Sequence, residues 1–293
     1  MKIRVPASSA NLGPGFDCFG IAWQLYNELE FEPGGTGLEI SGCDERYCGE
    51  NNLAYRAYKA VLERRGLACE PLRIRFLRSD IPISRGLGSS SALLVGGVIA
   101  ANALHGLNMS RDELLSVATA LEGHPDNVAP ALFGGLTVSA VEAGIPLSVH
   151  FPLSLELNFT ALVPPFELST ELSRGVLPHQ VPRADAIFNV SRAALLLSAL
   201  GSGDTGLLRA AMADRLHEPY RVTLIEGFDT ARGLAYKCGA DAMCISGAGS
   251  TLLCVSTSDG FAGRIADDLH AALPGWRVIP LQADFNGAYI EDQ

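Results

Sequence analysis

A long apolar run at residues 93–104 follows directly on a stretch that is rich in glycine and serine. Its only interruptions are Gly96, Gly97 and Asn102. A run of this length without a polar face predicts a helix that is buried on all sides. The glycines that precede it permit positive φ angles, and they predict a flexible loop that leads into the N-terminus of this helix.

Periodic patterns predict further elements in the first half of the chain. Residues 72–77 alternate apolar and charged side chains with a period of two, which predicts a half-exposed strand. Residues 38–41 are expected to form a hairpin with the preceding strand, across the turn Pro33-Gly34-Gly35. The other expected elements are strands at 2–6, 21–31, 133–140 and 147–151, and helices from Asn51 or Asn52 to about Arg65 and from the capping box Ser110-Arg111-Asp112-Glu113 to about Leu121.

The composition shifts near Phe151 and Pro152, where we expect a domain boundary. The second half is expected to run as a strand (158–163), a polar connector (169–177), helices (185–200, 205–216, 222–237), two strands (242–246, 251–256), a helix (260–273) and a strand (276–281). This order is the split βαβ arrangement of a ferredoxin-like domain. We therefore predict an α/β protein, two-layered in the α+β sense, with domains at 1–152 and 153–293.

Charge and cysteine usage narrow the possible functions. The formal net charge of −10 argues against a general surface for nucleic acid or anionic membranes, so an anionic ligand must meet a local basic cluster. No segment has the pattern of a signal peptide or the apolar length of a membrane span. The seven cysteines form no C-x-x-C pair and no zinc-like spacing with histidine. We expect free thiols in a reducing cytosol, and a cytoplasmic protein.

The glycine- and serine-rich stretch is the first candidate for binding chemistry. The first N–H groups of a helix lack partners and lie at the positive end of its dipole, so they favour phosphate. The stretch is no Walker A loop, because no lysine lies between Lys59 and Lys237. A turn without any ligand remains the alternative for the loop taken alone. The candidate residues are Pro82, Ile83, Ser84, Arg85, Gly86, Leu87, Gly88, Ser89, Ser90, Ser91 and Ala92.

Three segments together carry a resemblance to a known family. They are Pro6 to Asp17, which reads Pro-Ala-Ser-Ser-Ala-Asn-Leu-Gly-Pro-Gly-Phe-Asp, then 82–92, and then Ser246 to Thr251, which reads Ser-Gly-Ala-Gly-Ser-Thr. In order and separation they resemble the three motifs of the GHMP small-molecule kinases, and the similarity covers essentially the whole chain. The resemblance implies a ribosomal-S5-like N-terminal domain, a ferredoxin-like C-terminal domain, ATP in the cleft between them, and a homodimer.

Two further segments are similar to the members of this family that act on an amino acid. They are Glu122 to Pro130, which contains Gly-His-Pro-Asp-Asn, and Glu218-Pro219-Tyr220-Arg221. The resemblance implies ATP-dependent phosphorylation of the side-chain hydroxyl of L-homoserine, a small-molecule step toward threonine. The alternatives are a kinase for mevalonate or a sugar, and a nucleotide-binding regulator without catalysis.

The resemblance also implies roles for individual residues. Backbone N–H groups of 86–91 would hold the β- and γ-phosphates, and Ser90 and Glu122 would hold Mg²⁺, which prefers oxygen ligands. L-Homoserine is a zwitterion, so its ammonium needs acceptors and its carboxylate needs a bidentate cation. The candidates are Asn11 and Asp17 for the ammonium, Arg174 and Arg221 for the carboxylate, and His124 for a further polar contact.

The catalytic base is the open point of this hypothesis. Asn127 stands where some related kinases place an aspartate, and an amide cannot accept a proton at neutral pH. One alternative is that the substrate hydroxyl loses its proton to the γ-phosphate while Asn127 and Thr170 orient it. The other alternative is that Asp126 is the base. The roles of Arg85 and of the segment 246–251 stay undecided at this point.

Overall fold

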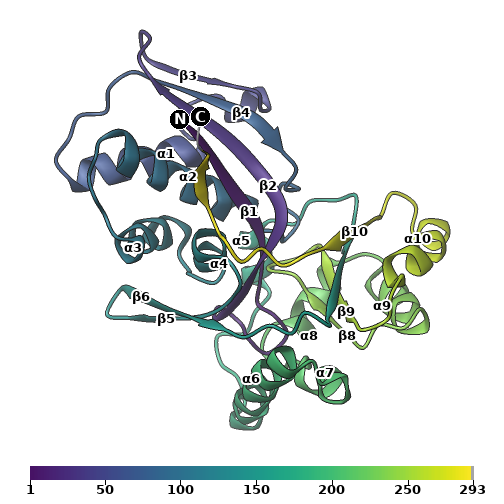
Figure 1. The fold of residues 1–293 in the computed structure, drawn as a ribbon. Helices are drawn as coiled ribbons and strands as arrows, with labels where there is room; N and C mark the ends of the chain where they lie inside the picture. Colours follow the sequence, from purple (N-terminus) through teal and green to yellow (C-terminus); the bar gives the residue numbers. More distant parts are fainter. Residues whose placement is uncertain (292–293) are drawn as a thin grey trace.

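A computed structural model describes residues 1–291 as two β-sheets with helices packed against them (Figure 1). Within these residues, seven strands form the first sheet in the order β11-β1-β2-β4-β3, with β5 paired to β2 and β6 paired to β5. Their bounds are β1 Lys2–Ala10, β2 Phe19–Pro33, β3 Leu38–Ser41, β4 Leu72–Ser79, β5 Leu136–Glu142, β6 Ile145–Phe151 and β11 Tyr289–Glu291.

Helix α2 (Ser89–Leu104) forms the centre of the first part of the molecule, and most of it is buried, as its apolar sequence predicts. It packs against β1 and against three other helices, α1 (Leu53–Arg64), α3 (Arg111–Glu122) and α4 (Val128–Phe133). Asn52 caps α1, and the capping box at Ser110 opens α3, both as expected. A short 3₁₀ helix, η1 (Glu45–Tyr47), lies between β3 and α1.

The second sheet contains four strands in the order β10-β7-β9-β8, and every neighbouring pair is antiparallel. In chain order this is 4-1-3-2, which confirms the ferredoxin-like arrangement. The strands are β7 Asn158–Val163, β8 Ala242–Ile245, β9 Leu252–Ser256 and β10 Arg277–Leu281, and the helices are α5 Thr170–Gly175, α6 Arg183–Ser202, α7 Thr205–Ala211, α8 Glu218–Arg221, η2 Val222–Leu224, α9 Phe228–Lys237 and α10 Phe261–Ala272.

One strand pairing differs from the expected one. Strand β3 pairs in parallel with β4 and not as a hairpin with β2. Strand β4 lies between them, and its Arg73 and Arg75 pair with Glu32 and Glu30 of β2. The edge of β2 is therefore occupied, and β3 pairs with the far side of β4.

Five local expectations also needed correction. The helix expected at 205–216 ends at Ala211. The short helix α4 occupies the start of the segment expected to be a strand from Phe133, and α5 forms inside the expected polar connector. The helix expected at 222–237 is divided into η2 and α9, with a break before Phe228. Strand β11 was not expected, and it returns the end of the chain to β1 of the first sheet. The boundary near residue 152 stays a prediction.

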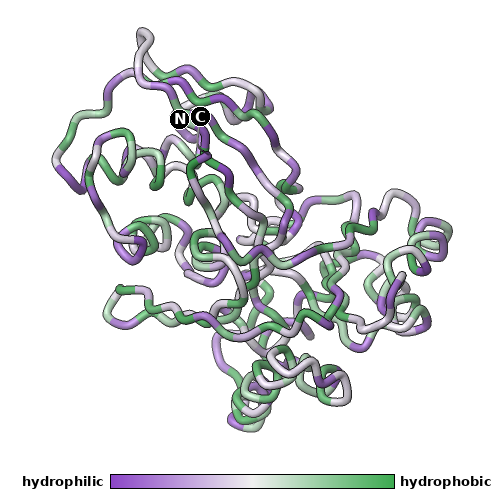
Figure 2. The backbone as a smooth tube through the Cα atoms, viewed as in Figure 1, coloured by the Kyte–Doolittle hydropathy of each residue, from purple (hydrophilic) through white to green (hydrophobic). Residues whose placement is uncertain are grey.

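Side-chain polarity follows the elements. Hydrophobic and hydrophilic residues alternate along many of the helices and strands (Figure 2), as expected for elements with one buried face. By length and composition alone, α6 could cross a membrane, contrary to the expectation from sequence, although one such helix is weak evidence. It buries Leu196, Ala199 and Leu200 in the protein core. The seven cysteines all lie within the described residues and are free thiols, as predicted.

Candidate active site

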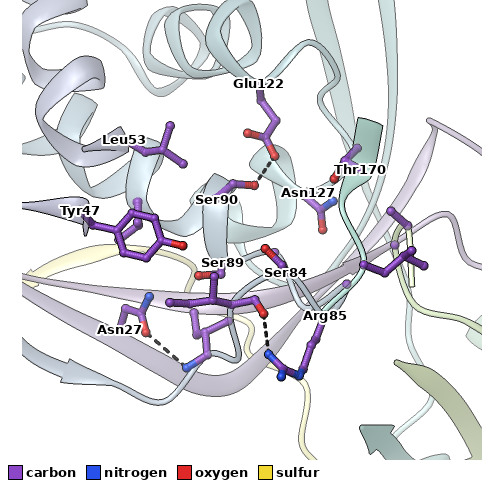
Figure 3. A pocket seen from close by; sticks show the side chains of 18 of the residues that line it. Asn27, Tyr47, Leu53, Ser84, Arg85, Ser89, Ser90, Glu122, Asn127 and Thr170 are labelled. Atoms are coloured by element: carbon purple, nitrogen blue, oxygen red, sulfur yellow. Dashed lines mark hydrogen bonds between the residues drawn. The ribbon is translucent and has the colours of Figure 1, made fainter. Parts of the chain in front are cut away.

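A cavity of about 530 Å³ brings together residues from both parts of the molecule (Figure 3). One end is lined by η1 and its flanking loops, including Tyr47 and Asn51. The middle is lined by the start of α2, and the other end is lined by Asn11, Arg174 and Arg221. The segments 82–92 and 122–127, and the motif near residue 250, all contribute lining residues to this one cavity.

The N-terminus of α2 presents free backbone groups to the cavity. Helix α2 begins at Ser89, and Gly88 before it has φ +71° and gives no side-chain cap. Ser89 and Ser90 both line the cavity. Unpartnered N–H groups and the positive end of the helix dipole make this position suitable for phosphate.

Two glycines allow the three motif segments to pack directly on one another. A Cβ atom on Gly86 would lie 2.1 Å from the carbonyl oxygen of Ser246, and one on Gly88 would lie 2.1 Å from Oγ of Ser8. Both have positive φ angles. The Oγ atoms of Ser246 and Ser9 are 2.6 Å apart, which joins the third segment to the first. Glycine is therefore required at 86 and 88 by close approach as well as by conformation.

Glu122 and Ser90 lie together at the start of α2. Ser90 donates a hydrogen bond to Oε1 of Glu122 at 2.6 Å (Figure 3). Ser91 donates to the same oxygen at 2.8 Å. A carboxylate and a hydroxyl at this separation are hard oxygen donors that can share one Mg²⁺ ion. The donor set therefore fits the metal role that we assigned to this pair.

Asp17 and Arg174 form a bidentate ion pair at the far end of the cavity. The two nitrogen-to-oxygen distances are 3.1 and 2.6 Å. Asn11 Oδ1 accepts the backbone N–H of Asp17 at 2.8 Å, which closes the loop between them. Both loop residues have positive φ angles, which asparagine and aspartate tolerate better than most residues. Groups proposed to bind opposite charges of one ligand are thus paired with each other here.

Arg221 is buried, with 1% of its surface exposed. Its Nε donates to the carbonyl of Ser173 at 3.3 Å, and its Nη1 donates to the carbonyl of Gly247 at 3.1 Å. Burial first, and the nearby charge of Arg174 second, lower the pKa of Arg221 to about 10. The guanidinium therefore remains charged near neutral pH, and the side chain lines the cavity.

The segment after α3 carries a second buried carboxylate. Asp126 is fully buried, and its Oδ1 accepts from the backbone N–H of Asn127 and contacts Nδ1 of His124. Its Oδ2 has no partner within the described residues. Burial lowers the pKa of His124, but the hydrogen bond and charge of Asp126, helped by Glu122, outweigh it and raise this pKa overall.

Asn127 and Thr170 reach the cavity from opposite parts of the molecule. Oδ1 of Asn127 accepts a hydrogen bond from the Ser8 hydroxyl at 2.9 Å, which leaves its amide NH₂ group for a ligand. Thr170 is the first residue of α5 and lines the same cavity. Both side chains appear among the cavity-lining residues of Figure 3.

Arg85 is anchored to the backbone. Its guanidinium donates to the carbonyls of Ile83, Pro164 and Pro165 at 2.8 to 3.2 Å. It therefore ties the glycine-rich loop to the segment after β7. Other members of 82–92, such as Leu87, are buried and contribute to the core.

Sequence reasoning missed four residues that support this site. Ser8 orients Asn127, Phe16 lies beside both Arg174 and Arg221, and Asp214 and His217 support the turn before Arg221. A signal for Ser8 existed, because polar residues inside a strand that is otherwise buried need partners. Asp214 carried no comparable signal, since its partners, the backbone N–H groups of 216–218 and the Asn189 side chain, are brought to it by the fold.

Comparisons with known proteins agree with this architecture. Residues 52–135 match the GHMP kinases N terminal domain, and residues 196–275 match the GHMP kinases C terminal domain. The class that this fold and site define is therefore an ATP-dependent kinase of the GHMP type. A homoserine kinase of Clostridium botulinum (strain Alaska E43 / Type E3) is 44% identical over 99% of this chain and 98% of its own length.

Two solved structures refine the comparison. The homoserine kinase of Cytophaga hutchinsonii has a TM-score of 0.88 at 30% identity, over 99% of this chain and 96% of that one. The mevalonate kinase of L. major, at 16% identity, has a TM-score of 0.73 over 98% and 96% of the two chains, and shares the fold. The chain belongs to the homoserine kinase family.

Proposed function

We propose that the chain transfers the γ-phosphoryl group of ATP to the side-chain hydroxyl of L-homoserine, which gives ADP and O-phospho-L-homoserine. The homoserine kinases among its relatives support this substrate. The observation that carries the proposal is that two guanidinium groups, Arg174 and Arg221, line the same cavity as the start of α2, with the Asp17 carboxylate paired to Arg174. Mevalonate and sugars have no ammonium group that would need Asp17.

In this proposal, phosphate binding falls to the backbone of 86–91. The N–H groups at the start of α2 hold the β- and γ-phosphates, and the helix dipole favours their charge. Ser90 and Glu122 hold Mg²⁺, which neutralises developing charge on the phosphates when bound. Without a ligand, the hydrogen bond between these two side chains keeps the donors in place.

Substrate binding is an exchange of ionic partners. Asp17 and Arg174 satisfy each other in the absence of a ligand. A zwitterion brings an ammonium for Asp17 and Asn11, and a carboxylate for Arg174 and Arg221. Neither protein charge is then left unpaired, whereas a ligand with a single charge would leave one partner uncompensated. His124, whose imidazole lies close to the Asp17 carboxylate, adds a polar contact.

In the reaction, the substrate oxygen forms a bond to the γ-phosphorus as the bond to the β–γ bridging oxygen breaks. The hydroxyl proton passes to a γ-phosphate oxygen, while Asn127 and Thr170 orient the hydroxyl. Asp126 is the alternative base. Its carboxylate is fully buried, and its Oδ1 is already bound to the backbone N–H of Asn127 and to His124. An Asp126→Asn variant with full activity would exclude Asp126 as the base.

Several finer statements belong to the same proposal. We propose a domain boundary at residue 152, one residue after β6 ends. A homodimer and a cytoplasmic location are consistent with the family, and they remain proposals.

The test is coupled ADP release with Mg²⁺ and ATP across homoserine, serine, threonine and mevalonate. We expect turnover with homoserine to exceed that with the others. Turnover with mevalonate alone would contradict the substrate, and ATP binding without turnover would contradict the activity. In parallel, a Thr170→Ala variant is expected to lose kcat while keeping the homoserine KM, as a group that acts only in the transition state should.

A further inference from the structure

His217 is a fully buried histidine to which the proposed chemistry assigns no role. Its Nε2 lies 2.8 Å from the carbonyl oxygen of Gly13, and its Nδ1 lies 3.2 Å from Nη1 of Arg221. A carbonyl only accepts hydrogen bonds and a guanidinium only donates them. The neutral tautomer is therefore fixed, with Nε2–H donating to Gly13 and Nδ1 accepting from Arg221.

The imidazole joins two segments of the substrate end. Gly13 belongs to the loop that carries Asn11 and Asp17, and Arg221 ends α8. The Phe16 ring of the same loop stacks on His217, with centroids 5.3 Å apart and planes inclined by 23°. The Arg221 guanidinium lies 5.1 Å from the centroid of that ring. The loop and the arginine are thus held together by one hydrogen-bonded side chain and one aromatic contact.

The buried carboxylate of Asp214 holds the backbone turn that carries His217. Oδ2 of Asp214 accepts the backbone N–H groups of Leu216, His217 and Glu218 at 3.1, 2.8 and 2.8 Å. This caps the turn that precedes α8 and sets the direction of the histidine side chain. The same oxygen is 3.8 Å from Nε2 of His217.

The neighbouring charges favour the neutral imidazole. Burial is the main cause that lowers the pKa of His217, the charge of Asp214 opposes it, and the charge of Arg221 adds to the lowering. Asp17 faces it from the substrate loop and raises this pKa, and the buried Glu218 follows it on α8. A proton on Nδ1 would remove the acceptor for Arg221 and place two cations in contact.

We propose that His217 is a positioning residue for the substrate carboxylate. Its neutral Nδ1 holds Nη1 of Arg221, so that the remaining guanidinium arm is directed to the cavity, and its Nε2–H ties the ammonium-binding loop to the same point. The inference rests on the proposed function, because it takes Arg221 as a ligand of the carboxylate. It assigns His217 no contact with the reacting atoms.

Three variants at this position test the roles of the two ring nitrogens separately. His217→Phe keeps an aromatic ring beside Phe16 but removes both nitrogens. His217→Asn keeps an acceptor near the position of Nδ1, and His217→Gln keeps a donor near the position of Nε2. His105→Phe is the matched control, because His105 pairs with Tyr58 in the first part of the molecule, away from the cavity lining.

Steady-state kinetics for each substrate are the readout. We expect His217→Phe to raise the homoserine KM about 10- to 100-fold, the usual cost of a lost hydrogen bond to a charged group, with kcat and the ATP KM little changed. His217→Asn should recover most of this loss, and His217→Gln should recover less. Equal effects on the KM of both substrates, or full recovery by Gln alone, would overturn the assignment to Nδ1.

The dependence of the homoserine KM on pH gives a second readout, which does not require the His217→Phe variant to fold. In the wild type, the homoserine KM should rise as pH falls and His217 becomes protonated. His217→Asn should lose that part of the acid limb. An identical acid limb in both proteins would contradict the proposal.

An Arg221→Ala variant separates this inference from the proposed function. If Arg221→Ala leaves the homoserine KM unchanged, the carboxylate assignment itself fails. If Arg221→Ala raises it and His217→Phe does not, the carboxylate assignment stands and only the role of His217 is wrong.

Discussion

The middle of the cavity, at the start of α2, offers backbone N–H groups, whereas the far end offers the side chains of Arg174 and Arg221, with Asp17 paired to Arg174. The first kind of site depends on backbone conformation and close packing of the loop, so its critical residues are glycines. The second kind depends on charge and on partners that hold each charge in place. Substitutions should therefore act differently at the two ends, through conformation at one and through electrostatics at the other.

The largest effect is expected from Gly88→Ala. The new Cβ would lie 2.1 Å from Oγ of Ser8, at φ +71°, so the loop must shift. A shift of about 1 Å in a reacting geometry costs on the order of 100-fold in rate, and we expect at least that loss in kcat/KM for ATP. Gly66→Ala is the control, because Gly66 has φ +69° and nothing within 4 Å of a Cβ atom. Equal values of kcat/KM for ATP in Gly88→Ala and Gly66→Ala would contradict this prediction.

The next effect is expected from Asp17→Asn. It removes the charge that pairs with Arg174 and that we assign to the substrate ammonium. The homoserine KM should rise about 10- to 100-fold, in line with the loss of a charge-assisted pair, while the ATP KM stays near its wild-type value. Asp229→Asn breaks the exposed pair with Arg232 and should change neither constant. A parallel rise in both KM values for Asp17→Asn would mean that the two ends are not independent.

A smaller, pH-dependent effect on stability is expected from Glu218→Gln. Glu218 accepts the Ile245 N–H at 2.6 Å, just before the third motif segment, and burial raises its pKa to about 8. The folded state thus binds a proton that the unfolded state releases above its ordinary pKa of 4.5. This stabilisation is full below the unfolded pKa and is lost as pH rises to about 8.

Denaturant unfolding measured across this pH range checks the prediction. Glutamine keeps an oxygen acceptor and carries no charge, so the wild type should lose stability relative to the variant as pH rises, by up to about 1.4 kcal/mol per pH unit. A difference that does not change with pH would show that Glu218 is not protonated in the folded protein.

The smallest kinetic effect is expected from Arg85→Ala, although Arg85 lies within the glycine-rich loop. Its guanidinium is already bound to three backbone carbonyls. We expect a change in the ATP KM of less than about threefold, because three of its five N–H groups are already committed to carbonyls and hold the side chain in place, together with a modest loss of stability. A large rise in the ATP KM would show that the charge of Arg85 contributes to phosphate binding. The contrast between a backbone site and a side-chain site would then be weaker.

The sequence was most informative where a local pattern decides the structure. The buried helix α2, the caps at Asn52 and Ser110, and the ferredoxin-like strand order all followed from periodicity and capping residues. It failed where a distant partner decides. Strand β3 pairs with β4 because β4 occupies the edge of β2, and β11 adds to β1 from the other end of the chain.

The same distinction applies to the site. Segment 82–92 and the charged candidates could be named from motif residues and from the chemistry of the ligand. The partner of each charge could not, because the ion pair between Asp17 and Arg174 and the contact between His217 and Arg221 depend on tertiary structure. Asp17 and Arg174 are 157 positions apart, so only the folded chain reveals that pair. His217 and Arg221 have the local i, i+4 spacing, but that spacing does not show that the imidazole also reaches Gly13, 204 positions away.

The most direct test is an experimental structure with a non-hydrolysable ATP analogue, Mg²⁺ and L-homoserine. The account predicts β- and γ-phosphate oxygens within hydrogen-bonding distance of backbone N–H groups in 86–91, with the amino-acid carboxylate on Arg174 and Arg221. Phosphates bound away from the start of α2, or a homoserine carboxylate that contacts neither arginine, would contradict it.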